Sequence, residues 1–153
     1  MGTPEERLAE LGLSVPDVAP PVAAYVPAVR VGSLVYTAGQ LPMLDGALMA
    51  TGRVGDGVTP EQATACAQQC GLNAIAAIRS VAGDLDRVRI VKVVAFVASS
   101  PDFTGQPGVA NGASELFGSV FGEAGVHARS AVGVPVLPLG APVEVEVIAE
   151  ILS

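Results

Sequence analysis

Apolar positions recur along the chain with two different periods, and these periods predict its secondary structure. Helical spacing is clearest after Thr59, where Pro60, Glu61 and Gln62 are typical of a first helical turn, and it ends at Gly83. A helix is therefore predicted from Pro60 to about Ala82. Its apolar stripe consists mostly of small residues: Ala63, Cys66, Cys70, Ala74, Ala77, Ile78 and Val81. Such a stripe favours close packing of the helix on a sheet.

Two further helices are predicted on either side of this one. Thr3, Pro4 and Glu6 form a capping box that opens a short helix from Pro4 to Leu11, and a proline-rich connector from Ser14 to Val22 follows it. Another helix is predicted from Val109 to Phe121, after a loop over residues 100–108. Strands are predicted over residues 22–31, 33–39, 48–54, 87–98, 129–136 and 143–152.

The last predicted strand alternates between two kinds of side chain. Its odd positions from Val143 to Ile151 are apolar, whereas Glu144, Glu146 and Glu150 point to the opposite face. Only residues 137–142 separate it from the strand before it. We therefore expect the last two strands to form an antiparallel hairpin that pairs Val136 with Val143 and brings Arg129 near Glu150.

The order of elements predicts one α+β domain over residues 1–153, with residues 1–20 as a helical extension and connector. Right-handed crossovers would place the two longer helices on one face of a single mixed sheet. The strand from Val93 to Ala98 is apolar at every position, which is typical of a strand buried on both faces. Because no element is left to cover the helix-free face, we expect a second subunit to cover it.

Composition narrows the class of protein. Half of the 153 residues are hydrophobic and 15% are charged, against about 25% charged in ordinary domains. No apolar run approaches the roughly 18 residues of a membrane helix. The net charge of −7 disfavours nucleic acid as a partner. Residues 1–13 do not resemble a signal peptide, so we expect a cytoplasmic protein. Cys66 and Cys70 are expected to be core residues rather than metal ligands.

Candidate chemistry is sparse. His127 is the only histidine, and we expect it to be a solvated loop residue; no motif of a serine or zinc hydrolase is present. Arg129 alternates with Ala131 and Gly133, whose small side chains would leave its guanidinium free to bind a carboxylate. The alternative is an interface salt bridge with a glutamate of the last strand. In the predicted hairpin Glu144 lies roughly 20 Å from Arg129, so a site that uses both must lie between subunits.

Several segments resemble the RidA/YjgF family of enamine and imine deaminases, also called L-PSP. They are Tyr25 to Val29, Gly32 to Gln40, Ala128 to Val132, and Leu137-Pro138 through Glu146. The resemblance spans about residues 20 to 151. It implies a chorismate-mutase-like fold, a homotrimer, and three ligand sites in clefts between subunits.

The resemblance also implies roles for individual residues. Arg129 matches the arginine that binds the substrate carboxylate, and Glu144 the glutamate that orients the attacking water. The residues that match the pocket lining are Tyr25, Ala38, Gly39, Asn111 and Pro138. Ala38 and Ala131 stand where the best-studied branch has serine and cysteine, which implies a reshaped pocket.

The family reaction is hydrolysis of 2-aminoacrylate, or its 2-iminopropionate tautomer, to pyruvate and ammonia, with neither cofactor nor metal. Two alternatives remain from other classes of function. One is a trimer that binds small carboxylic acids or carbonyl metabolites without turnover. The other, which the net charge disfavours, is an endoribonuclease or translation inhibitor.

Overall fold

A five-stranded mixed sheet forms the centre of the computed structural model, which describes residues 2–18, 20 and 23–153. Its strands lie in the order β1 (Ala28–Val31), β2 (Leu34–Thr37), β9 (Val143–Ile151), β7 (Val88–Ala98) and β8 (Ala128–Val134). Strands β7 and β8 are parallel, and the other neighbours are antiparallel. The α+β class and the mixed central sheet are as predicted.

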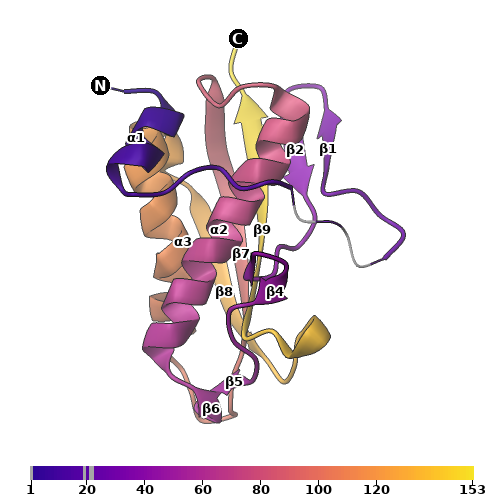
Figure 1. Ribbon diagram of the computed structural model, residues 1–153, viewed down its shortest axis with the longest axis vertical. Helices are drawn as coiled ribbons and strands as arrows, with labels where there is room; N and C mark the ends of the chain where they lie inside the picture. Colours follow the sequence, from indigo (N-terminus) through magenta and orange to yellow (C-terminus); the bar gives the residue numbers. More distant parts are fainter. Residues whose placement is uncertain (1, 19, 21–22) are drawn as a thin grey trace.

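Helices α1 (Pro4–Glu10), α2 (Pro60–Ala82) and α3 (Gln106–Phe121) lie on one side of this sheet (Figure 1). Capping boxes at Thr3 and Thr59 start α1 and α2, and Gly83 ends α2, as the sequence predicts. Helix α3 begins three residues earlier than expected, because Gln106 and Pro107 form its first turn. The other face of the sheet carries no helix of the described chain.

Short elements replace one strand that was predicted. The expected strand over residues 48–54 is wrong: Ala47–Leu48 (β4) pairs with Met43–Leu44 (β3), and Arg53–Val54 (β5) pairs with Gly57–Val58 (β6). The strand expected over residues 22–31 begins only at Ala28, and Val22 lies outside the described residues. Two 3-10 helices, η1 (Gly122–Gly125) and η2 (Pro138–Gly140), precede β8 and β9.

The predicted hairpin of the last two strands is also wrong. Strand β7 lies between β8 and β9, so that Phe96 pairs with Val132 on one side and with Glu144 on the other. Helix α3 carries the chain from β7 to β8 as a parallel crossover, and β9 then takes the opposite edge of β7. Arg129 therefore pairs with Val93 and not with Glu150, which pairs with Arg89 and Leu34.

The core fills the space between the helices and the sheet. Phe117, Ile75 and Ile78 from the helices pack with apolar residues of β7 and β9 such as Val93 and Val145. Cys66 and Cys70 are buried and unpaired in the core, as predicted, and burial raises the pKa of both thiols. Helices α2 and α3 approach closely at Gly112, where a Cβ would overlap the carbonyl oxygen of Thr64.

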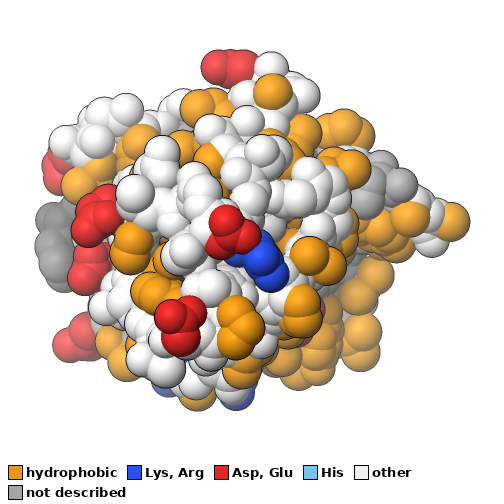
Figure 2. Space-filling model, turned by 90° about the horizontal axis from the view of Figure 1, so that it is seen from below, with side chains coloured by type: hydrophobic (Ala, Val, Ile, Leu, Met, Phe, Trp, Pro, Cys, Tyr) orange, Lys and Arg blue, Asp and Glu red, His pale blue; other side chains and the backbone are white. Residues whose placement is uncertain are grey.

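Apolar side chains also lie on the helix-free face. Val94 and Phe96 of β7 are only half-buried there, and Tyr36 and Val132 on neighbouring strands are 40% and 43% exposed. Seen from the end of the molecule that carries β5 and β6, charged side chains are few among hydrophobic and neutral ones (Figure 2). Among the helices of the described chain, none has the length and apolar character needed to cross a membrane.

Candidate functional site

Glu144 lies on β9 and points to the helix-free face. Its neighbours along the strand, Val143 and Val145, are buried under the helices, so alternation turns Glu144 to the other side. The carboxylate is half-buried and lies against Gly39, where even a Cβ would overlap Oε1. Burial raises the pKa of Glu144, and the charge of Glu146 raises it further.

The segment that follows β2 holds Gly39 in this position. Gln40 and Val145 exchange backbone hydrogen bonds of 2.8 and 3.0 Å, and the amide of Ala38 donates to the carbonyl of Pro27 at 2.8 Å. Ala38 and Gly39 therefore lie beside Glu144, and Tyr25, which is 43% exposed, lies two residues before Pro27. Pro138 is exposed in η2, on the turn that leads into β9.

Arg129 lies on the edge strand β8 and points to the other side of the sheet. It pairs with the buried Val93 and reaches helix α3, where its Nη1 donates to Asn111 Oδ1 at 2.7 Å and to Ser114 Oγ at 3.2 Å. The structure thus brings the predicted residues Arg129 and Asn111 together. Among the described residues Arg129 makes no ion pair, and the glutamates of β9 lie on the opposite face.

His127 is not the solvated loop residue that was expected. Its Nε2 lies 2.9 Å from Ser114 Oγ, its Nδ1 lies 2.6 Å from the carbonyl oxygen of Gly125, and its ring packs edge-on against Phe117. Sequence reasoning also missed Ser114. The available signal was its spacing, because Ser114 follows Asn111 by three residues and so shares its helix face.

Within one chain the guanidinium of Arg129 and the carboxylate of Glu144 are far apart. Arg129 is level with Val93 of β7 and Glu144 with Phe96, three residues further on, which is roughly 10 Å along the strand. The strand β7 lies between them and adds about 10 Å across the sheet. They also face opposite sides of the sheet. The expectation that one chain cannot bring them together thus holds, although the hairpin on which it was based does not exist.

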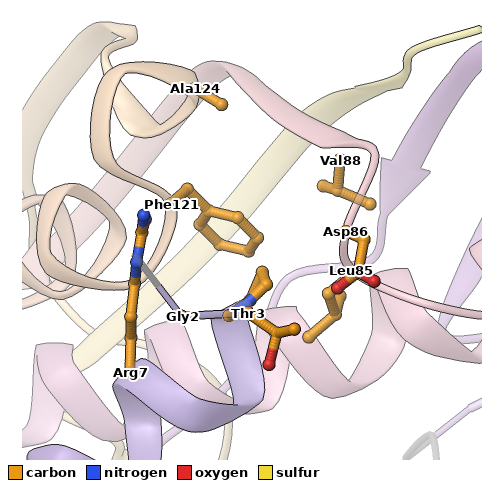
Figure 3. A pocket seen from close by; sticks show the side chains of 9 residues that line it. Gly2, Thr3, Arg7, Leu85, Asp86, Val88, Phe121 and Ala124 are labelled. Carbon is orange, nitrogen blue, oxygen red and sulfur yellow. The ribbon is translucent and has the colours of Figure 1, made fainter.

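A shallow pocket elsewhere is unrelated to these groups. It has a volume of about 290 Å³ and lies where α1 meets the ends of α2 and α3, with Arg7, Asp86 and Phe121 among the lining residues (Figure 3). None of the predicted site residues lines it. The described residues contain no cluster of three His, Cys, Asp or Glu side chains that could hold a metal ion.

Comparison with known proteins identifies the family. Residues 5–151 match the family model described as "YjgF/chorismate_mutase-like, putative endoribonuclease". The chain belongs to the RidA/YjgF family.

Individual relatives agree with this assignment. Protein TCP17 of Trypanosoma cruzi is 46% identical over 95% of this chain and 92% of its own length. The crystal structure of Atu1372 from Agrobacterium tumefaciens, a protein of unknown function, is 44% identical with a TM-score of 0.90 and covers 97% of this chain and 93% of that one. The crystal structure of a protein from Shewanella oneidensis, described as a "putative endoribonuclease", is 36% identical with a TM-score of 0.95. The match covers 98% of this chain and 100% of that one.

For this RidA/YjgF chain, the two groups offer complementary chemistry. The guanidinium of Arg129 presents hydrogen-bond donors to an anion. The half-buried carboxylate of Glu144, with its raised pKa, can hold a water molecule and accept a proton from it. Within one chain these two groups do not face a common substrate, because they lie on opposite sides of the sheet.

Proposed function

We propose that the protein hydrolyses small 2-imino acids, with 2-aminoacrylate and its 2-iminopropionate tautomer as the substrate class. The observation that carries the proposal is the environment of Glu144. Its carboxylate is half-buried on an apolar face, lies against a backbone position that has no side chain, and has a raised pKa. A raised pKa makes this carboxylate a stronger base towards a bound water than an ordinary exposed glutamate.

The reaction adds water to a carbon–nitrogen double bond. Arg129 binds the substrate carboxylate, and Glu144 orients a water molecule towards C2 of the imine and accepts its proton. A C2–O bond forms as the π pair moves to nitrogen, and Glu144 passes the proton it accepted to that nitrogen. The C2–N bond then breaks, ammonia leaves, and the C2 hydroxyl loses its proton as the carbonyl of pyruvate forms. Water supplies the oxygen and both hydrogens of the exchange, so no redox partner is needed. Positioning provides much of the acceleration, because a protonated imine is already electrophilic.

The proposal includes a homotrimer with the site between subunits. Within one chain Arg129 and Glu144 face opposite sides of the sheet, so a neighbouring chain has to supply the second group. The apolar helix-free face, with Val94, Phe96 and Val132, is a surface for that contact. Light scattering is expected to give the mass of a trimer, and a stable monomer at micromolar concentration would contradict this part of the proposal.

The test is pyruvate release from 2-aminoacrylate that a dehydratase generates in the assay. We expect the wild type to accelerate release over the spontaneous rate, and Arg129→Ala and Glu144→Gln to abolish the acceleration. Glu146→Gln is the comparison on the same face, because Glu146 is exposed: it should retain the acceleration at pH 7 and change only how the rate falls at acid pH. No acceleration by the wild type would refute the proposal, and binding of pyruvate without turnover would favour a carboxylate-binding trimer.

Endoribonuclease activity, which the name of the Shewanella relative suggests, has weaker support. The net charge of −7 repels a phosphate backbone. Metal-free RNA cleavage commonly uses one group as an acid and another as a base. The chain's only histidine does not supply such a pair, because its two ring nitrogens already lie against Ser114 and Gly125.

A further inference from the structure

A chain of hydrogen bonds leads from the backbone of η1 to the guanidinium of Arg129. The carbonyl oxygen of Gly125 lies 2.6 Å from His127 Nδ1, His127 Nε2 lies 2.9 Å from Ser114 Oγ, and Ser114 Oγ accepts from Arg129 Nη1 at 3.2 Å. Three elements meet in it, namely η1, α3 and the start of β8. Neither Ser114 nor His127 has a role in the function proposed above.

The carbonyl of Gly125 sets the direction of each hydrogen bond in the series that leads to Arg129. A carbonyl oxygen can only accept, so Nδ1 of His127 carries the proton between them. In the neutral ring Nε2 is then an acceptor, and the hydroxyl of Ser114 donates its proton to it. This turns a lone pair of Ser114 Oγ towards Arg129, where it accepts from Nη1. Each group therefore has one role that fits its neighbours.

Gly125 and His127, the first two members of this hydrogen-bond series, are held rigidly. Gly125 is buried, and a Cβ at this position would overlap the backbone of Phe117 and Gly118 on α3. The ring of His127 packs edge-to-face against Phe117, with ring centroids 5.9 Å apart and planes at 83°. Because both ends of the imidazole are fixed, its Nε2 presents Ser114 with an acceptor at a defined place.

The consequence for Arg129 is that one edge of its guanidinium is already occupied. Nη1 has two protons, and Asn111 Oδ1 and Ser114 Oγ accept one each. Nε and Nη2 have no acceptor among the described residues. These two atoms form the side of the fork that can hold both oxygens of a carboxylate.

We propose that Ser114 and His127 are positioning residues that fix Arg129 so that its Nε–Nη2 edge receives the carboxylate of a 2-imino or 2-keto acid. The inference rests on the proposed function for the substrate class. Through Arg129, the His127–Ser114 pair then contributes to binding of the carboxylate and not to the chemical step. Loss of either residue should therefore raise KM and the Kd for product while kcat changes little.

Two substitutions at His127 separate positioning from a structural role. In His127→Gln the side-chain oxygen can take the place of Nε2 and accept from Ser114, but the bond to Gly125 is lost. In His127→Asn the amide can take the place of Nδ1 and donate to Gly125, but it does not reach Ser114. Positioning predicts the larger loss in His127→Asn, whereas a purely structural role in anchoring the loop predicts the larger loss in His127→Gln.

The experiment measures Kd for pyruvate by calorimetry and KM and kcat with 2-aminoacrylate, on the full-length assembled protein. We expect Ser114→Ala and His127→Asn to raise Kd and KM about tenfold, as expected for a displaced binding group. Ser114→Thr and His127→Gln should stay within about threefold of the wild type, because each retains the group that the chain needs. Ser119→Ala, an exposed serine on the same helix, is the control.

Several outcomes overturn the inference. They are equal values for the two His127 variants, a larger loss in His127→Gln, a Ser114→Ala protein that matches Ser119→Ala, and a wild type that does not bind pyruvate. Failure of the proposed function is distinguishable: a wild type that binds pyruvate without turnover refutes the deaminase, and the Kd series alone then decides the role of Ser114 and His127.

Discussion

Glu144 is the residue at which function and stability should conflict. Burial of its side chain and the nearby charge of Glu146 raise its pKa, so the folded protein holds the proton at pH values where the unfolded chain, with a pKa of about 4.3, has released it. When the folded state binds more protons, stability falls as the pH rises through the interval between the two pKa values. Above that interval the wild type retains an ionised carboxylate in an unfavourable environment.

Glu144→Gln should therefore be more stable than the wild type at pH 7 and inactive in pyruvate release. The gain in Tm is expected to shrink as the pH is lowered towards 4, where the wild-type carboxyl is protonated in both states. Thermal melts from pH 4 to 8 measure it. A Tm difference that is independent of pH would contradict the account of Glu144.

In Glu146→Gln, removal of the neighbouring charge should lower the pKa of Glu144 and move the acid limb of kcat to lower pH.

Gly39 offers a second test at the same scale. A Cβ at Gly39 would overlap Oε1 of Glu144 and force the carboxylate to move. We expect Gly39→Ala to lower kcat by about 100-fold, which is the scale of a displacement of roughly 1 Å in a reacting group. Gly108→Ala, where the added methyl meets nothing within 4 Å, should retain activity and so controls for the substitution itself. Full activity of Gly39→Ala would show that Glu144 does not need its observed position.

The sequence predicted some of the residues around Arg129 correctly and others not. Arg129 was predicted from the alternation of its strand and again from the family resemblance, and Asn111 from the resemblance alone; the structure joins them by a hydrogen bond. The prediction for His127 was wrong because its partners, Gly125 and Ser114, come from η1 and α3. A loop position suggests solvent, and only the packing of α3 against β8 turns the ring inward.

At the scale of elements, the contact between α2 and α3 depends on glycine. A Cβ at Gly112 would overlap the carbonyl oxygen of Thr64 and touch Ala67, whereas a Cβ at Gly118 on the same helix meets nothing within 4 Å. Gly112→Ala should destabilise the fold by about 1–3 kcal/mol through overpacking. Gly118→Ala should stabilise it by up to about 1 kcal/mol, because alanine loses less conformational entropy in a helix. Urea denaturation of both variants measures the difference, and equal effects would contradict the close packing of α2 and α3.

Elements whose signals are local were predicted well. The capping boxes at Thr3 and Thr59 and the alternation of β9 lie within a few residues of sequence, and the structure confirms them. Strand pairing is not local: β9 could pair with β8 by a short turn or with β7 across the sheet, and the same alternation fits both. The two-residue strands β3 to β6 have too few positions to show any period.

At the scale of the whole molecule, the proposed assembly of subunits accounts for both the low charge and the apolar helix-free face. Only 15% of residues are charged, and Val94, Phe96 and Val132 lie on a face that no helix of the described chain covers. A ring of subunits would bury that face and bring Glu144 of one chain towards Arg129 of the next. In a closed ring the contact is head-to-tail, so each site would take its two groups from different chains.

Mixing two inactive variants tests this arrangement directly. Arg129→Ala and Glu144→Gln are each expected to be inactive alone. When equal amounts are unfolded, mixed and refolded, random assembly places an intact arginine opposite an intact glutamate at about a quarter of the sites if the groups come from different chains. Pyruvate release should then recover to about 25% of the wild-type rate for refolded protein. If both groups of a site came from one chain, no site in the mixture would be complete, and the absence of recovery would overturn the inter-subunit site.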